Sequence, residues 1–208
     1  MNLSKRLKAI ADLVDGKNVI DVGCDHGYLD IYLTKNNIKC LATDISEYCI
    51  KKAKDNFKEY SLNIETKVTN GLDGIDTSLY DTIIISGMGT HTILKILYKK
   101  QLTDTLIISS NNDLELLRRN IIKLGYYIEN EIYINENNKP YIIIKFKKGV
   151  RKYGKYDYII GPIAKKDKKY LEYLINNSIH RISKIPENHL DKINYYKDLI
   201  NECRNNQR

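Results

Sequence analysis

The sequence predicts an α/β fold built on a mostly parallel, doubly wound sheet. Short apolar runs alternate with amphipathic stretches of helical spacing, and glycines follow several of the apolar runs. The series closes with two neighbouring apolar runs separated by a polar turn. Alternating strands and helices favour parallel strands joined by helices, whereas two strands joined by a turn form an antiparallel hairpin. We therefore expect the last strand to be antiparallel.

The first part of the predicted fold begins with a helical stripe that starts at Leu3 and ends before Gly16. The elements expected next are a strand at 18–22, a helix at 28–35, a strand at 39–44, a helix at 46–60 and a strand at 63–69. Ser46 is the expected N-cap of the third helix, because a serine hydroxyl there accepts a hydrogen bond from the first turn.

The second part contains the most apolar strand, at 81–86, which we place at the centre of the sheet. It is followed by a helix at 90–100, a strand at 104–109, a helix at 114–124, and strands at 126–134 and 141–147 around the turn 135–140. The first domain is therefore predicted to span 1–150.

The remaining residues, 151–208, are predicted to form a separate basic appendage. Residues 148–162 contain glycines, a proline and several lysines and tyrosines, which is typical of a linker. Two apolar stripes of helical spacing follow, from Leu171 to Ile182 and from Leu190 to Cys203, with Pro186 between them. They predict a helical, coiled-coil-like hairpin.

The positive charge is concentrated in this last part. The net charge is +8, yet residues 145–208 hold 16 Lys and Arg against 7 Asp and Glu, while the first 144 residues hold 18 against 19. Such asymmetry favours a polyanionic partner, usually a nucleic acid, although a solvated basic tail has the same composition.

Composition also argues against several classes of protein. No apolar run is long enough for a transmembrane helix, and the first residues lack the apolar core of a signal peptide. The four cysteines are scattered, which indicates neither a zinc site nor disulfides. We therefore expect a cytoplasmic protein without a metal or a membrane partner.

The first predicted site follows the strand at 18–22, where Gly23 and Gly27 frame a sharp turn into a helix. Glycine lets the backbone pass close to a ligand, and the helix N-terminus offers free N–H groups. The GxGxxG spacing of dinucleotide enzymes is absent, and Asp21 and Asp25 would repel a pyrophosphate. These carboxylates suit a ligand with ammonium and sulfonium groups, which favours S-adenosylmethionine over NAD.

Further cofactor contacts are expected at the ends of the following strands. Asp44 lies 23 positions after Asp21, the place of a carboxylate that reaches both ribose hydroxyls. Asn70 would face the adenine edge, although a simple Asn-Gly turn has the same sequence. The full predicted cofactor set is Asp21, Gly23, Cys24, Asp25, Gly27, Asp44, Ile45, Asn70, Gly71, Gly87 and Met88.

Two strings resemble one family closely. Asp21-Val-Gly-Cys-Asp-His-Gly-Tyr-Leu29 and Ser86-Gly-Met-Gly89 are similar to motifs of bacterial tRNA (adenine-N1)-methyltransferases that modify adenine 22 in the D-loop. The likeness covers most of the chain and includes Leu3-Ser4-x-Arg6-Leu7 and Leu117-Arg-Arg119. It departs at Cys24, Thr90 and Ser109-Ser110, where the family usually has Ser, Gly and Gln-Pro.

The resemblance implies a class I, Rossmann-like methyltransferase domain with a C-terminal helical domain, and tRNA as the substrate. The residues alone indicate only an S-adenosylmethionine-dependent methyltransferase, with nucleic acid the favoured target. We expect His26, Tyr28 and Asn111 at the methyl-transfer pocket, because they lie at strand ends. The predicted RNA contacts are Arg6, Arg118, Arg151, Lys152, Lys155, Lys165 and Lys166.

Four alternatives stay open at this point. In the first three, the chain is a methyltransferase whose target is another RNA, a protein or a small molecule. In the fourth, the chain is an RNA-binding protein that has lost catalysis. The basic last third argues against a small molecule, and intact Asp21, Gly23 and Asp44 argue against loss of the cofactor. A monomer is expected.

Overall fold

The computed structural model describes residues 3–98 and 100–208. The chain divides into two compact units, residues 1–151 and 152–208. Residues 1–2, at the predicted N-terminus, and residue 99, within the predicted helix 90–100, lie outside the described residues.

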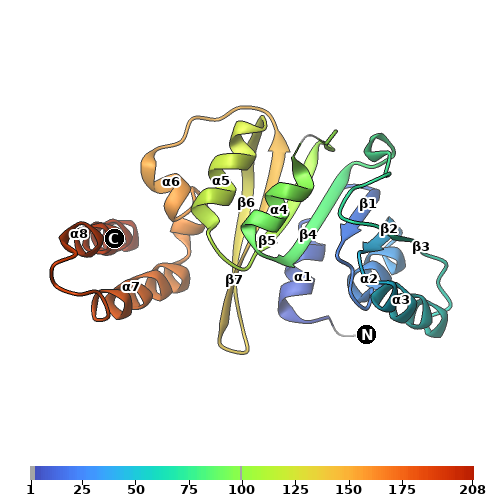
Figure 1. The fold of residues 1–208 in the computed structure, drawn as a ribbon, viewed down its shortest axis with the longest axis horizontal. Helices are drawn as coiled ribbons and strands as arrows, with labels where there is room; N and C mark the ends of the chain where they lie inside the picture. Colours follow the sequence, from blue (N-terminus) through green and yellow to red (C-terminus); the bar gives the residue numbers. More distant parts are fainter. Residues whose placement is uncertain (1–2, 99) are drawn as a thin grey trace. The chain divides into compact units, whose positions relative to one another are not determined.

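The first unit contains a seven-stranded sheet with helices on both faces (Figure 1). The strands run in the order β3 (Glu65–Val68), β2 (Lys39–Asp44), β1 (Asn18–Val22), β4 (Thr82–Met88), β5 (Thr105–Ser110), β7 (Lys139–Lys148) and β6 (Tyr126–Glu136). The first five are parallel, and β7 is antiparallel to both β5 and β6. This confirms the predicted sheet with its antiparallel ending.

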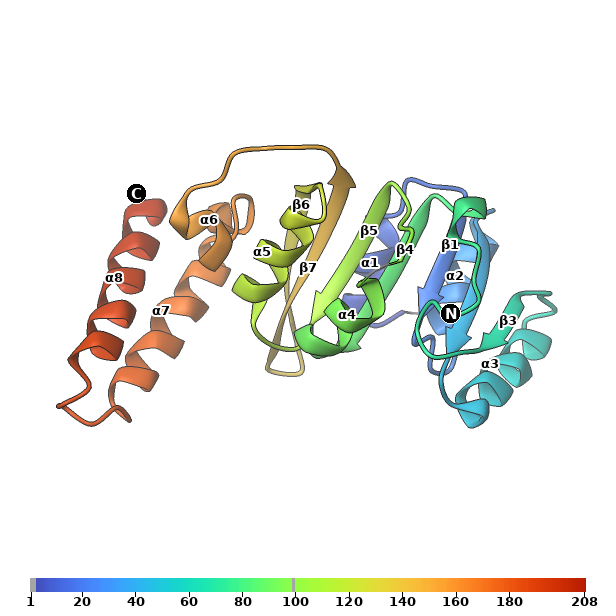
Figure 2. The same ribbon diagram turned by 45° about the horizontal axis from the view of Figure 1, so that its top comes forward.

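The parallel strands β1, β2, β4 and β5 are largely buried because helices cover both faces (Figure 2), whereas β3 at the edge is mostly exposed. On one face lie α1 (Lys5–Asp12), α2 (Tyr28–Lys35) and α3 (Glu47–Glu59); on the other lie α4 (Thr90–Leu97) and α5 (Leu114–Lys123). Within β4, Ile83–Ile85 are completely buried. A short 3-10 helix, η1 (Thr77–Leu79), precedes β4.

Two boundaries differ from the prediction for identifiable reasons. The strand β4 continues to Met88 through a bulge at Gly87, whose φ of 81° few other residues adopt. The hairpin turn is only Asn137-Asn138, with φ of 51° and 61°, rather than 135–140. Asparagine tolerates this left-handed conformation, which matches the twist of a tight hairpin.

The second unit is mainly helical. Its elements are α6 (Lys155–Ile159), a short 3-10 helix η2 (Ala164–Lys166), α7 (Lys168–Ile182) and α8 (Leu190–Gln207). The helices α7 and α8 pack against each other, as the two apolar stripes predict. The segment expected to be a plain linker contains α6, because the Asp157 carboxylate accepts a hydrogen bond from the Gly154 amide and caps the helix. No helix among the described residues is long and apolar enough to cross a membrane.

Candidate active site

The turn between β1 and α2 brings the backbone close to the carboxyl ends of the neighbouring strands. Gly23 donates its amide to the Thr43 carbonyl at 2.8 Å and has a φ of 82°. A side chain at Gly23 would come within 2.4 Å of Met88 Cε. Gly27, with a φ of 72°, forms the N-cap of α2. Both glycines therefore allow a close approach that other residues would block.

We expect Gly27→Ala to lower the free energy of unfolding by about 2–3 kcal/mol. The added Cβ would lie 2.4 Å from the Phe57 ring and would also adopt a left-handed φ. Gly125→Ala is the matched control, because Gly125 has a φ of 89° but nothing within 4 Å of a new Cβ. Urea unfolding should show about 1 kcal/mol for the control. Equal losses in the two variants would show that the contact with Phe57 contributes nothing.

One pocket of about 170 Å³ lies across the ends of β1, β2 and β4. Its lining residues are Val22, Gly23, Asp44, Ile45, Thr69, Asn70, Gly71, Met88, Thr92 and Ile96. The Asp44 carboxylate is fixed in this wall, since it accepts hydrogen bonds from the Asp25 amide at 3.2 Å and the Ser46 amide at 2.9 Å. The pocket thus combines apolar walls with one oriented carboxylate.

A second pocket of about 80 Å³ adjoins the first, because Gly23 lines both. It is polar and is lined by Arg6, Leu7, Asp21, Gly23, Cys24, Asp25, His26, Tyr28, Leu29 and Ser86. The half-exposed His26 ring bonds Asp25 Oδ1 through Nδ1 at 2.8 Å and stacks beside Tyr28 with 6.2 Å between ring centroids. Two aromatic rings therefore form part of the wall of this pocket.

Arg6 belongs to this second pocket. Its guanidinium donates a hydrogen bond to Ser86 Oγ and lies 5.4 Å from the centre of the Tyr141 ring. Its charge also lowers the pKa of Asp21, against the larger effect of burial. A cation and carboxylates therefore share one small cavity, which suits a ligand that carries both an ammonium and a carboxylate group.

Asn111 lies just after β5, near the bulge in β4. Its side-chain amide donates to the Gly87 carbonyl at 2.9 Å, and its backbone amide donates to the Met88 carbonyl at 2.9 Å. The neighbouring Asn112 accepts from the Thr90 amide at 2.9 Å and so holds the start of α4. Asn111 is not among the residues that line either pocket.

Nine of the eleven predicted cofactor residues line one or both of these pockets. They are Asp21, Gly23, Cys24, Asp25, Asp44, Ile45, Asn70, Gly71 and Met88. Gly27 and Gly87 shape the adjoining backbone without lining a pocket. Sequence reasoning missed Thr69, Thr92, Ile96 and Ser86. Thr69 and Ser86 lie at or near strand ends, a position too common to identify a side chain, whereas Thr92 and Ile96 lie on α4 and reach the pocket only through the packing of that helix.

The prediction that Arg118 contacts RNA is wrong. The Arg118 side chain is completely buried on α5, and its Nε lies 2.8 Å from Oε1 of the equally buried Glu131 on β6. A guanidinium enclosed in this way cannot reach a phosphate. The basic pair at 118–119 gave no indication of which arginine faces the core.

The other predicted RNA contacts lie at or near the surface of their units. Arg151 is exposed and covers the Tyr127 ring at 4.0 Å, and Lys152, Lys155 and Lys166 are exposed. Lys165 is partly covered and forms an ion pair with Asp157 at 2.8 Å, so its charge is already compensated. RNA contact by these residues therefore stays a prediction. Lys165 is the least suited to it, because its charge is already paired with Asp157.

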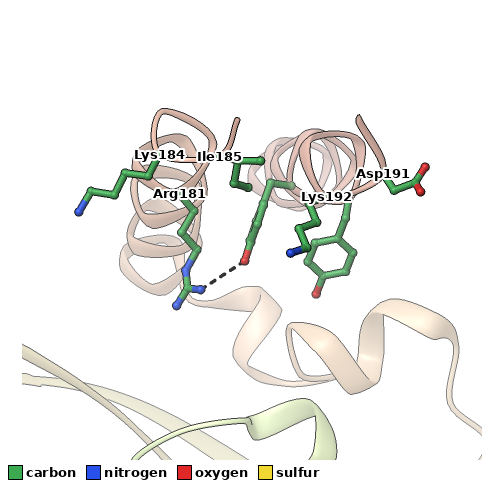
Figure 3. A pocket seen from close by; sticks show the side chains of 7 residues that line it. Arg181, Lys184, Ile185, Asp191 and Lys192 are labelled. Carbon is green, nitrogen blue, oxygen red and sulfur yellow. Dashed lines mark hydrogen bonds between the residues drawn. The ribbon is translucent and has the colours of Figure 1, made fainter. Parts of the chain in front are cut away.

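A groove between α7 and α8 adds cations and aromatic rings that were not in the predicted set (Figure 3). Its volume is about 520 Å³, and it is lined by Arg181, Lys184, Ile185, Asp191, Lys192, Tyr195 and Tyr196. Arg181 Nη1 lies 3.3 Å from the Tyr196 hydroxyl, and Tyr195 is 40% exposed. In Figure 3 the Lys192 side chain is directed between the helices, whereas Asp191 points away.

Comparison with known proteins gives matches along almost the whole chain. Residues 3–144 match the family model described as a methyltransferase domain. A Mycoplasma genitalium protein, provisionally named a tRNA methyltransferase, is 30% identical over 181 residues, which are 81% of this chain and 83% of the relative.

Two solved structures share the fold of both units. TrmK of M. capricolum, in complex with the cofactor product S-adenosyl-homocysteine, has a TM-score of 0.84 and 30% identity, covering 98% of this chain and 96% of the other. The B. subtilis m1A22 tRNA methyltransferase TrmK has a TM-score of 0.83 and 26% identity, covering 99% and 98%.

Proposed function

Because the chain belongs to the methyltransferase domain family, we propose that it transfers the methyl group of S-adenosylmethionine to N1 of adenine 22 in the tRNA D-loop. The observation that carries this function is the pair of adjoining pockets at the carboxyl ends of β1, β2 and β4, one apolar with the Asp44 carboxylate and one charged. In open α/β sheets ligands bind at this edge.

The residues of the two pockets fit the two ends of the cofactor. Asp44 would bind the ribose hydroxyls, while Ile45 and Met88 would cover the adenine ring. In the second pocket, Arg6 suits the cofactor carboxylate and Asp21 suits its ammonium group. Arg6, which was predicted to contact phosphate, is therefore better explained as a cofactor contact.

The substrate side requires positioning more than base catalysis. Bound S-adenosylmethionine supplies an activated methyl group, and the N1 lone pair of adenine accepts it without losing a proton. His26 and Tyr28 offer rings on which a flipped adenine can stack. The Asn111 amide nitrogen is held by Gly87, which orients its oxygen to accept a hydrogen bond from the exocyclic amine of adenine. Asp25 would stabilise the positive charge of the methylated base. No metal is required for this chemistry.

We expect Asn111→Ala to lower kcat/KM for tRNA methylation about 10- to 100-fold, because the variant cannot form one hydrogen bond to the base. The dissociation constant of S-adenosylmethionine should stay unchanged. The matched control is His91→Ala, which changes an exposed position on α4. Asn112→Ala is unsuitable as a control, because Asn112 holds the start of α4. Wild-type turnover of Asn111→Ala would remove Asn111 from the substrate site.

We also propose that the groove between α7 and α8 contacts tRNA phosphates. Within the described part of the chain, neither Lys184 nor Lys192 forms an ion pair. Arg181 adds a third cation, and the exposed Tyr195 ring offers a surface for base stacking. The excess of basic residues in this unit adds further positive charge, which attracts the negatively charged tRNA backbone.

The double variant Lys184→Ala/Lys192→Ala should weaken tRNA binding and flatten its salt dependence. Removing one lysine that neutralises a phosphate reduces the slope of log affinity against log salt by about 0.7–0.9. The control is Lys51→Ala/Lys54→Ala, which removes two exposed lysines of α3. Filter binding at several salt concentrations measures both slopes. Identical slopes for the two double variants would contradict phosphate binding in the groove.

Methyl transfer from labelled S-adenosylmethionine to unmodified tRNA tests the activity itself. We expect label in the tRNA and none in a bulk protein fraction or in 5S ribosomal RNA. Label in protein alone would place the chain among protein methyltransferases. We further propose that the protein acts as a monomer in the cytoplasm, where its proposed substrate, tRNA, is found.

A further inference from the structure

Two carboxyl groups are buried side by side beneath the second pocket. Asp21, at the end of β1, is 5% exposed, and Asp30, in the first turn of α2, is completely buried. The two side chains are within hydrogen-bonding contact. Apart from this contact, the Asp30 carboxyl has only its own backbone amide as a partner among the described residues. Two buried carboxyl groups in contact cannot both ionise without a large cost, so a proton must lie between these two groups.

The surroundings decide which of the two carboxyls holds the proton. Asp21 lines the pocket and is close to the Arg6 guanidinium, which favours its ionised form. Among the described residues no cation acts on Asp30, and burial followed by the charge of Asp21 raises the pKa of Asp30 well above its usual value. Burial also raises the pKa of Asp21 to about 7, although the hydrogen bond from Asp30 and the charge of Arg6 act against it.

Other titratable groups face the pair from the neighbouring elements. They are Arg6 on α1, Cys24, Asp25 and His26 in the loop after β1, and Cys40 and Asp44 on β2. The charge of Asp44 also acts to raise the pKa of Asp21. Arg6 is the one cation in this set whose charge does not depend on pH in the neutral range, so it does not itself produce a change there.

We propose that Asp30 is a positioning residue that keeps its proton at neutral pH and donates it to Asp21, fixing Asp21 as the single negative charge that receives the cofactor ammonium group. This rests on the proposed function only in naming S-adenosylmethionine as the cofactor. The role requires a neutral donor at position 30, not a second negative charge.

The pH dependence of cofactor binding follows from this arrangement. An ammonium group favours ionised Asp21, so binding lowers the pKa of Asp21 and releases its proton. Affinity should therefore be constant from about pH 7 up to the pH at which the ligand's own ammonium group loses its proton, and should fall by up to about tenfold per pH unit below about pH 7. The measurement is calorimetric titration of the full chain with S-adenosylhomocysteine, which keeps the ammonium group, between pH 5.5 and 9.

Two substitutions at one position test the proposal. Asp30→Asn keeps a neutral donor and should retain the wild-type midpoint within about half a pH unit. Asp30→Leu removes the donor, so Asp21 should ionise only at higher pH: affinity at pH 7 falls about tenfold and recovers by pH 9. Asp21→Asn should abolish this pH dependence, whereas Asp55→Asn, at an exposed position on α3, should leave it intact.

Each outcome has a definite reading. A midpoint moved as far by Asp30→Asn as by Asp30→Leu would overturn the proposal, because position 30 would then act through charge. A loss of affinity in Asp30→Leu that is the same at every pH would also overturn it, because the role would be structural only. If Asp30→Leu does not fold, the pH midpoint of cofactor binding by Asp30→Asn tests the proposal alone: a wild-type midpoint supports it and a shifted midpoint overturns it. Failure of the wild-type chain to bind S-adenosylhomocysteine at any pH would instead contradict the proposed function.

Discussion

Arg118→Ala is expected to destabilise the first unit by about 3–5 kcal/mol, enough to unfold a large fraction of the protein at 37 °C. The reason is that Glu131 would lose the charge of Arg118 while its own side chain stays buried. Both side chains are 0% exposed, and the Arg118 Nε to Glu131 Oε1 distance is 2.8 Å. Urea unfolding followed by circular dichroism measures the loss.

Two further variants separate burial from charge. Arg119→Ala removes a half-exposed arginine that pairs with Glu115 one turn earlier on α5, and should cost less than about 1 kcal/mol. The double variant Arg118→Leu/Glu131→Leu should recover most of the stability, since no charge then stays buried. Weaker tRNA binding by folded Arg118→Ala, with unchanged stability, would contradict this account and restore the RNA role.

Asp44→Ala is expected to weaken S-adenosylmethionine binding at least about 100-fold. Two hydrogen bonds to a charged acceptor contribute about 1.5–3 kcal/mol each, and about 1.4 kcal/mol corresponds to a factor of ten. The loss has two parts, because Asp44 also fixes the amides of Asp25 and Ser46 that shape the loops. Calorimetry gives the affinity directly.

The controls for Asp44 distinguish the ribose contact from loop geometry. Asp12→Ala removes an exposed carboxylate on α1 that pairs only with Lys8 and should leave binding unchanged. Asp44→Asn keeps one acceptor oxygen for the backbone and should fall between wild type and Asp44→Ala. Wild-type affinity in Asp44→Ala would remove this carboxylate from the cofactor site and would count against the assignment of the first pocket.

The sheet could be predicted from the sequence because each central strand has a local apolar pattern. Within the run at 81–86, Ile83–Ile85 are apolar on both faces, as a strand covered on both sides requires, and the run forms the centre of the sheet as β4. The end of β4 was missed because a bulge at Gly87 depends on pairing with β5, which no local pattern records. The short helix α6 was missed because a capping carboxylate, Asp157, outweighs the glycines around it.

The site could be predicted only where backbone geometry restricts the residue type. Gly23 and Gly27 need a left-handed φ and a close approach, and their carboxylate neighbours follow from the strand ends. Side chains that work through tertiary contacts were not predictable. Arg118 on α5 is buried against Glu131 on β6, and Asp30 on α2 meets Asp21 at the end of β1 only in the tertiary structure.

The most direct test of the central claim compares two tRNA transcripts that differ only at position 22. Labelled S-adenosylmethionine is incubated with the protein and with each transcript, one carrying adenine and the other guanine at that position. We predict label in the adenine transcript, released as 1-methyladenine after digestion, and none in the guanine transcript. Equal labelling of both transcripts would contradict the assignment to adenine 22.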